Sequence, residues 1–199
     1  MDKKYKLTEE THPDNPKLKR IVALRDFGII KAGDRGGWIE SELNLSHDGT
    51  CWVYNNAKVF DNAQVWGNAR ISEDAKVYDN AKVYGETRVF GAAQIFGNAE
   101  VFGSAWVFEY AKVRDNAWVC DKALVYSDAQ VCDKAWVFGN ALVFDDAQIC
   151  DNAHVCGEAK VYGHAQVYDN AHVCGEAKVW GDAEVDGNTV LSLYNEVCK

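Results

Sequence analysis

An aliphatic residue recurs at every sixth position from Val53 to Val185 without interruption. This spacing defines 23 hexads, with valine at 20 of the aliphatic positions and isoleucine at three. Four positions after each aliphatic residue stands a small one, alanine in every hexad except at Thr87 and Thr189. Because the small residue lies two positions before the next aliphatic one, both side chains point to the same face of a short strand. A six-residue strand and turn cannot bury its own apolar face, so neighbouring units must stack into a solenoid.

The turns between these strands are built without proline. The whole chain has two prolines against 16 glycines, and Gly, Asp or Asn stands at the bend of most hexads. These residues tolerate the unusual backbone angles that a tight corner requires. A helical alternative fails, because a six-residue period is not a multiple of 3.6 and glycine recurs too often.

The pattern [Leu/Ile/Val]-x-x-x-[Ser/Thr/Ala/Val]-x resembles the hexapeptide repeat of left-handed parallel β-helices. The resemblance covers residues 51–190 and implies an all-β fold, a left-handed parallel β-helix (β-solenoid) with three hexads in each coil and nearly eight coils. Residues 1–50 are then an N-terminal capping segment and residues 191–199 a C-terminal cap, because a solenoid must protect its open ends. Residues 33–42 resemble the leader of uncharacterised bacterial and phage repeat proteins, many of which are labelled transferases on the strength of the repeat alone.

Charge narrows the classes of partner. The 30 acids and 21 bases give a formal charge of −9, which disfavours a nucleic-acid binder. Of the 21 acids after residue 50, 17 occupy the two corner positions of the hexad, where Asp favours turns. No stretch of eighteen apolar residues is present, and the start of the chain is polar, which predicts a cytoplasmic protein of a bacterial cell that does not act at a membrane.

A catalytic role is not predicted. Hexapeptide-repeat families include acyltransferases and γ-class carbonic anhydrases, and the resemblance to them implies a trimer with a histidine between adjacent prisms. The acyltransferases also extrude a loop from one coil, whereas the hexad phase here is unbroken. None of the five histidines lies in a loop insertion: His12, His47, His154, His164 and His172. We therefore predict no catalytic residue and no cofactor.

Two stacked His-Val-Cys segments are candidate zinc ligands. His154 and Cys156 precede His172 and Cys174 by three hexads, so the four side chains lie on adjacent coils. Duplication of one coil explains the same arrangement, and we expect no metal. The seven cysteines, an odd number without an export signal, are expected to be free thiols. Disulfides from Cys156 to Cys174 or from Cys132 to Cys150 are not expected, because in-register Cβ atoms lie nearly 5 Å apart.

The outward surface contains more apolar residues than a solvated wall needs. The position after each aliphatic residue is aromatic in 15 hexads and cysteine in five more. In-register aromatics reinforce parallel pairing. Near the middle of the solenoid, however, the position before the aliphatic residue is Trp or Leu in several hexads instead of a charged or polar residue. We predict a protein interface along the edge where two apolar walls meet, formed by Trp106, Phe108, Trp118, Leu124, Tyr126, Trp136, Phe138, Leu142 and Phe144.

The sequence thus favours a non-catalytic, rigid binding or self-assembly module, a homo-oligomer (dimer or trimer) or the partner of another protein. One alternative is a phage-encoded inhibitor of host defence that binds a host protein or sequesters a small nucleotide. In that case aromatic faces such as Phe90 would stack on a base and the stacked Arg70 and Arg88 would meet a phosphate. A second alternative is an enzyme resembling the hexapeptide acyltransferases.

Overall fold

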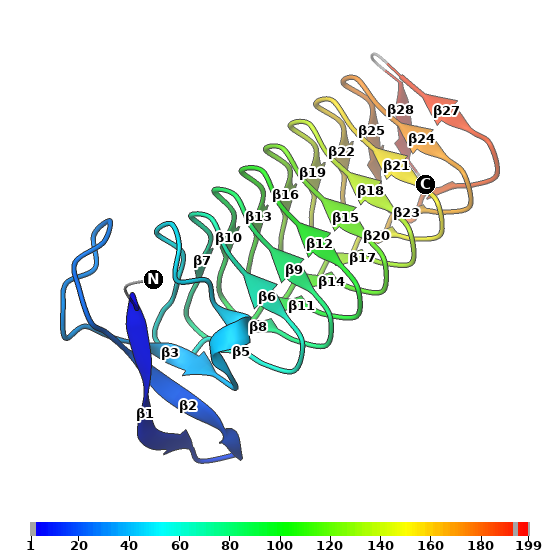
Figure 1. Ribbon diagram of the computed structural model, residues 1–199. Coiled ribbons are helices and arrows are strands. Elements are labelled where there is room, and N and C mark those ends of the chain that lie inside the picture. Colours follow the sequence, from blue (N-terminus) through cyan, green and yellow to red (C-terminus); the bar gives the residue numbers. More distant parts are fainter. Residues whose placement is uncertain (1–2, 193–194, 199) are drawn as a thin grey trace.

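The computed structural model describes residues 3–192 and 195–198 of the 199-residue chain. It is a parallel β-solenoid whose coils lie side by side along one axis, with a strand hairpin at the N-terminal end (Figure 1). Strands that are three hexads apart pair in parallel, as Val89 does with Val107. The predicted all-β solenoid with three hexads in each coil is therefore confirmed. Its left-handed sense stays a prediction.

Three sheets form the walls of the solenoid, and the chain runs from wall 1 to wall 2 to wall 3 in each coil. Wall 1 contains β1 (Tyr5–His12), β2 (Asn15–Ala23), β3 (Arg35–Ile39), β5 (Lys58–Val59), β8 (Lys76–Val77), β11 (Gln94–Ile95), β14 (Lys112–Val113), β17 (Gln130–Val131), β20 (Gln148–Ile149), β23 (Gln166–Val167) and β26 (Glu184–Val185). Wall 2 contains β6 (Gln64–Val65), β9 (Lys82–Val83), β12 (Glu100–Val101), β15 (Trp118–Val119), β18 (Trp136–Val137), β21 (His154–Val155), β24 (His172–Val173) and β27 (Val190–Leu191). Wall 3 contains β4 (Trp52–Val53), β7 (Arg70–Ile71), β10 (Arg88–Val89), β13 (Trp106–Val107), β16 (Leu124–Val125), β19 (Leu142–Val143), β22 (Lys160–Val161), β25 (Lys178–Trp180) and β28 (Glu196–Cys198).

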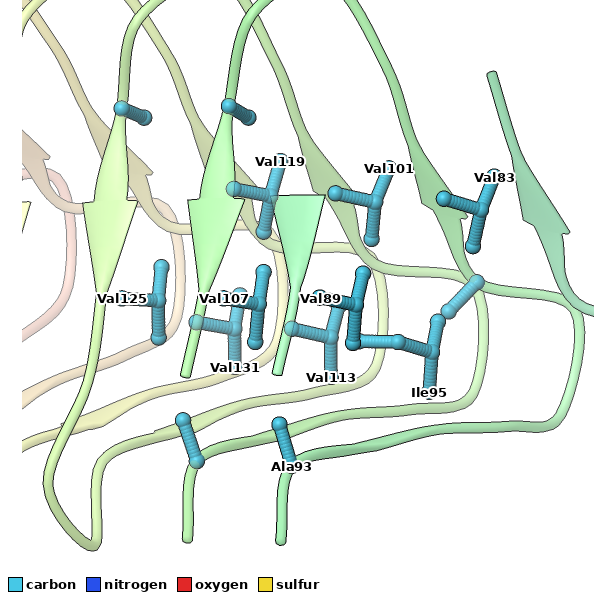
Figure 2. Close-up of a cluster of buried hydrophobic side chains, with 14 of the residues drawn as sticks. Val83, Val89, Ala93, Ile95, Val101, Val107, Val113, Val119, Val125 and Val131 are labelled. Carbon is cyan, nitrogen blue, oxygen red and sulfur yellow. The ribbon is translucent and has the colours of Figure 1, made fainter. Parts of the chain in front are cut away.

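The inward residues of the hexads make one continuous core. Every aliphatic residue of the repeat from Val53 to Val185 is at most 3% exposed. Figure 2 shows the valines of walls 2 and 3 converging with Ile95 and the valines of wall 1 inside the coil. Thr87 replaces an alanine in this core, and its Oγ1 donates a hydrogen bond to the Tyr84 carbonyl at 2.6 Å. The hydroxyl is therefore satisfied although it is buried.

The corners explain the position of the acids. The first of the two corner residues stands two positions after the inward aliphatic residue. It has a positive φ, which is +69° at Gly97 and +61° at Asp115. Where that residue is Asp, its carboxylate can accept a hydrogen bond from the next coil, as Asp79 Oδ2 does from the Gly97 amide at 3.0 Å. Corner acids thus stabilise the stacking of coils while most of them remain exposed. Residues 53–185, all of them described, contain no extruded loop, as predicted.

The solenoid extends into both predicted caps. β3 pairs in parallel with β5, and Leu45 forms a parallel bridge with Val65, so a coil is already present before residue 51. Partners in this coil are two residues further apart in sequence than partners in the later coils, because the next aliphatic position after Leu45 is Val53 rather than residue 51. These two extra residues hide the coil from a six-residue count. At the other end β27 and β28 continue walls 2 and 3.

The N-terminal hairpin closes the first coil. β1 and β2 pair antiparallel, and β2 pairs antiparallel with β3, so the open edge of wall 1 is covered. Lys4 is fully buried at this end, and its Nζ donates to the Cys51 carbonyl at 2.9 Å. Burial lowers the pKa of the Lys4 ammonium. Tyr5 donates from its hydroxyl to the Leu45 carbonyl at 2.7 Å, next to the 3-10 turn η1 (Glu42–Asn44).

Candidate interaction surface

Each wall presents two columns of outward side chains, one on either side of the inward aliphatic residue. On wall 3 the column next to wall 2 contains Arg88, Trp106, Leu124 and Leu142 in register. On wall 2 the column next to wall 3 contains Cys120 and Phe138, each one residue after the inward valine. The predicted apolar residues therefore do lie on two adjacent walls.

Trp118 and Trp136 belong to a different edge from the one predicted. They stand in the column of wall 2 next to wall 1, and together with the corner residues Asn116 and Lys134 they line a shallow hollow. Their rings stack 4.8 Å apart with an interplanar angle of 9°. The ring faces are thus turned along the solenoid axis, and the outward edges leave the side chains 36% and 39% exposed. The sequence assigned the correct wall but did not distinguish its two columns.

Phe108, Tyr126 and Phe144 also face away from the edge between walls 2 and 3. They stand in the column of wall 3 next to wall 1, and their rings stack in a ladder with centroid separations of 4.8 and 5.0 Å. The ladder continues to Tyr162 at 4.9 Å. All four rings are half-buried by their neighbours. This column is a structural ladder that reinforces parallel pairing.

The edge between walls 2 and 3 keeps six apolar side chains over three consecutive coils. We name this surface the 2/3 edge: it consists of Phe102, Cys120 and Phe138 on wall 2, Trp106, Leu124 and Leu142 on wall 3, and the corner residues 103–104, 121–122 and 139–140. All six apolar side chains are half-buried. Phe102 was missed by the sequence prediction, although its position after an inward valine is the same as that of Phe138.

Charge separates this edge from the other two. Its corner residues over the three coils include one acid, Asp121, and one base, Lys122. Over the same three coils, the corners between walls 1 and 2 have two acids, Asp115 and Asp133, and one base, Lys134. The corners between walls 3 and 1 have four acids and no base: Glu109, Asp128, Asp145 and Asp146. The 2/3 edge is therefore apolar and locally neutral on a chain of charge −9.

Cys120 is the one thiol at the 2/3 edge. Burial, followed by the charge of Asp121, raises the pKa of this thiol to about 11. The thiol is therefore protonated at neutral pH, and because the thiolate is the reactive form, Cys120 acts as a small apolar group and not as a nucleophile.

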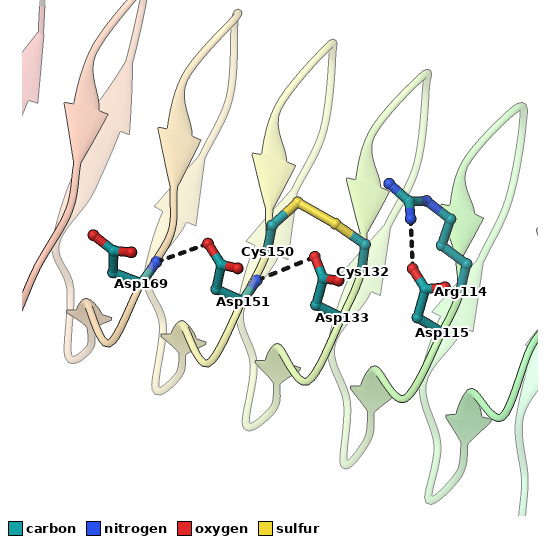
Figure 3. The surroundings of a disulfide bond; sticks show 7 residues. All are labelled: Arg114, Asp115, Cys132, Asp133, Cys150, Asp151 and Asp169. Carbon is teal, nitrogen blue, oxygen red and sulfur yellow. Dashed lines mark hydrogen bonds and ion pairs between the residues drawn. A yellow bond between two sulfur atoms is a disulfide. The ribbon is translucent and has the colours of Figure 1, made fainter.

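Four cysteines form disulfides, which corrects the expectation of free thiols. Cys132 is joined to Cys150 on wall 1 (Figure 3). Cys156 is joined to Cys174 on wall 2. The expectation relied on a coil spacing of nearly 5 Å. The Cα atoms of the two pairs lie 4.7 and 4.6 Å apart, within the range of about 4.4–6.8 Å that disulfides accept. Side-chain rotation brings the sulfur atoms together.

The disulfides also remove the candidate zinc ligands. With Cys156 and Cys174 bonded to each other, the four-residue set has no free thiolate. His154 and His172 remain adjacent, with ring centroids 4.6 Å apart in an edge-to-face contact. Burial, followed by the nearby His172, lowers the pKa of His154. The pair packs below Trp136, whose ring stacks on His154 at 5.2 Å.

Thiol counting checks this pairing. We expect three cysteines, Cys51, Cys120 and Cys198, to react with a maleimide in protein denatured without reductant, and all seven after reduction. Intact mass spectrometry of the adducts gives both counts. Seven adducts before reduction would contradict the disulfides.

Because each bond closes a loop of about 18 residues, the Cys132→Ser, Cys150→Ser variant should lose about 3 kcal/mol of unfolding free energy.

The fold and its repeat define the class: the chain is a parallel β-solenoid built from six-residue repeats, and its repeat is similar to that of the YdcK β-solenoid family. The family model of the YdcK β-solenoid repeat matches residues 93–109. An uncharacterized acetyltransferase, YdcK of Escherichia coli (strain K12), is 35% identical over 80 residues, which cover 35% of this chain and 24% of that protein. The chain thus spans about a quarter of that relative's length. In the described residues, no helix is long and apolar enough to cross a membrane.

Proposed function

We propose that this protein is a rigid, non-catalytic β-solenoid that self-associates through the 2/3 edge. The observation that carries the proposal is that six apolar side chains flank corners with one acid and one base. The corners of the same coils have two acids and one base between walls 1 and 2, and four acids and no base between walls 3 and 1. Two chains that met at an acidic corner would repel each other, and at the 2/3 edge they would not.

The wall 3 column supports a contact at this edge. In this column Trp106, Leu124 and Leu142 follow one another between Arg88 in the coil before them and Lys160 in the coil after them. An Arg or Lys covers the wall with its stem and keeps its charge in water. A leucine at the same position exposes apolar area without that benefit, and each Å² removed from water by a second copy contributes about 25 cal/mol. Packing against a second copy gives the leucines a role that the isolated solenoid does not.

Sedimentation equilibrium tests the contact. We expect the wild type to form a dimer or trimer at micromolar concentration, and the Leu124→Glu, Leu142→Glu variant to be a folded monomer. The matched control is Gln130→Glu, Gln148→Glu, which adds the same charges on wall 1 at residues that are likewise paired in register. This control should keep the wild-type mass.

Two outcomes would overturn the proposal. One is a wild type that is monomeric at these concentrations. The other is an oligomer that survives the leucine substitutions but is split by Trp118→Lys, Trp136→Lys, which would place the contact at the edge between walls 1 and 2.

Salt should strengthen self-association. The chain carries a net charge of −9, so two copies repel each other at long range even when they meet at a neutral edge. The Debye screening length shortens from about 30 Å at 0.01 M salt to about 8 Å at 0.15 M. The dissociation constant measured by sedimentation should therefore fall as salt rises over this interval. A constant that rises with salt would indicate an interface held by ion pairs instead.

The name of the E. coli relative raises acetyl transfer as an alternative. The candidate general base, His154, is half-buried between Trp136 and His172, and the corner loops are too short to cover an acyl donor. We expect no release of coenzyme A when the protein is incubated with acetyl-coenzyme A and amino sugars. Release that disappears in a His154→Ala variant would favour the enzyme.

A further inference from the structure

The aromatic ladder of wall 3 is interrupted once near its N-terminal end. The column next to wall 1 runs Tyr54, Ser72, Phe90 and Phe108 on successive coils. Phe90 and Phe108 stack 4.8 Å apart with an interplanar angle of 3°. Ser72 therefore leaves one ring position of the column empty between Tyr54 and Phe90.

This gap is a pocket of about 370 Å³. Tyr54, Ser72 and Phe90 line it together with Ile29, which belongs to the loop between β2 and β3 and is 69% exposed. Two coil steps separate Tyr54 from Phe90, about 9.6 Å at the usual strand spacing. One planar ring inserted above Ser72 would thus stack on both neighbours at about the spacing seen elsewhere in the ladder.

Two arginines stand beside the gap. Arg70 and Arg88 line the same pocket, each two residues before Ser72 or Phe90 on its strand, and they are paired in register. The Cα atoms of residues two apart on a strand are separated by about 6.6 Å. The sugar of a nucleotide can span this distance between its base and its phosphate. Both side chains are exposed, and among the described residues neither guanidinium lies within 4.0 Å of a carboxylate oxygen.

The remaining charged and aromatic groups fit this arrangement. The Arg88 guanidinium lies 4.7 Å from the centroid of the Trp106 ring, which holds it over the wall. Glu73 also lines the pocket, but its Oε2 accepts a hydrogen bond from the Gly91 amide at 2.9 Å. Like charges directly opposite each other in a sheet are unfavourable, and an anion between Arg70 and Arg88 would relieve that repulsion.

We infer that this pocket binds a nucleotide, with the base inserted between Tyr54 and Phe90 and the phosphate held by Arg70 and Arg88. Base stacking on aromatic side chains and planar guanidinium contacts to phosphate are the interactions that recognise this chemistry. The site shares Trp106 with the 2/3 edge, whereas the ring slot and both arginines lie outside the residues that define that edge.

Isothermal titration with AMP, GMP, CMP and UMP tests the site in the wild-type protein. At least one of them should bind with a dissociation constant below about 1 mM, and the matching nucleoside and inorganic phosphate should each bind at least about tenfold more weakly. Phosphate alone binding as tightly as the nucleotide would mean that only an anion patch is present, and no binding of any nucleotide would overturn the site.

Substitutions separate the ring slot from the phosphate contacts. Ser72→Phe fills the gap with the type of residue that 15 hexads have at this position, so the variant should fold and lose binding. Arg70→Gln and Arg88→Gln should each weaken binding at least about tenfold, because a charged hydrogen bond is lost. The control Lys160→Gln removes one charge from the same column of wall 3 and should bind like the wild type. A Ser72→Phe variant that binds like the wild type would contradict the slot.

Discussion

An Ile95→Asp substitution is expected to remove much of the unfolding free energy of the protein. Ile95 is fully buried in the core of Figure 2 and pairs in register with Val77 and Val113 on the coils before and after it. A carboxylate there would be surrounded by valine and alanine side chains, with no partner for its charge. An unpaired buried charge and the lost apolar contacts together cost more than about 4 kcal/mol, while a whole domain is stable by about 5–15 kcal/mol.

The neighbouring Gln94 provides the control. Gln94→Glu places a carboxylate one residue away, on the outer face of the same strand and between Lys76 and Lys112. This variant should unfold in urea within about 0.5 kcal/mol of the wild type, as surface substitutions usually do. Circular dichroism followed through a urea titration gives the unfolding free energy of both variants. An Ile95→Asp protein as stable as the wild type, or equal losses in the two variants, would contradict the inward and outward assignment.

A Gly97→Val substitution should also lower the unfolding free energy substantially. Gly97 has φ +69°, and a Cβ added there would lie 2.7 Å from the Asp115 amide nitrogen of the next coil. A β-branched residue is strongly disfavoured at positive φ, and backbone strain of this kind costs about 1–3 kcal/mol before any displacement of the coil. We expect a loss of at least about 2 kcal/mol in urea unfolding.

The matched variant is Gly97→Asp. The same corner position is Asp79 one coil earlier and Asp115 one coil later, with φ +56° and +61°. The corner thus accommodates an Asp side chain, and its carboxylate can accept a hydrogen bond from the following coil, as Asp79 does. Its Cβ meets the same 2.7 Å contact, but Asp avoids the β-branching and gains the hydrogen bond, so the loss should be smaller than that of Gly97→Val. A Gly97→Asp variant as unstable as Gly97→Val would mean that the corner needs the absence of a Cβ rather than a tolerant backbone.

The solenoid could be predicted from the sequence because six-residue periodicity is a strictly local signal. Val53 and its 22 successors fix the strands, the inward face and the coil of three hexads without knowledge of any distant contact. The coil before residue 51 was missed because two additional residues between Leu45 and Val53 shift the phase. The parallel pairing of β3 with β5 and of Leu45 with Val65 reveals that coil.

The surface was less predictable, because it depends on which side of a strand a residue occupies. Trp118 and Leu124 both stand where other hexads have charged or polar residues, which is why the sequence assigns them to one interface. In the structure a corner and the width of a wall separate them. The disulfides were missed for a similar reason. The prediction rests on in-register Cβ atoms nearly 5 Å apart and takes no account of the side-chain rotation that joins Cys132 to Cys150, whose Cα atoms are 4.7 Å apart. Side-chain geometry of this kind is not encoded in the repeat period.

Photo-crosslinking from a benzoylphenylalanine that replaces one of two lysines tests the proposed self-association most directly. Lys122 lies at the 2/3 edge, and Lys134 has the equivalent corner position between walls 1 and 2; both are exposed. A benzoylphenylalanine at position 122 should crosslink to residues 102–142 of a second copy, identified by mass spectrometry of mixed heavy and light chains. The same residue at position 134 should give little or no crosslinked dimer. Equal crosslinking from both positions, or from position 134 alone, would contradict the 2/3 edge as the contact.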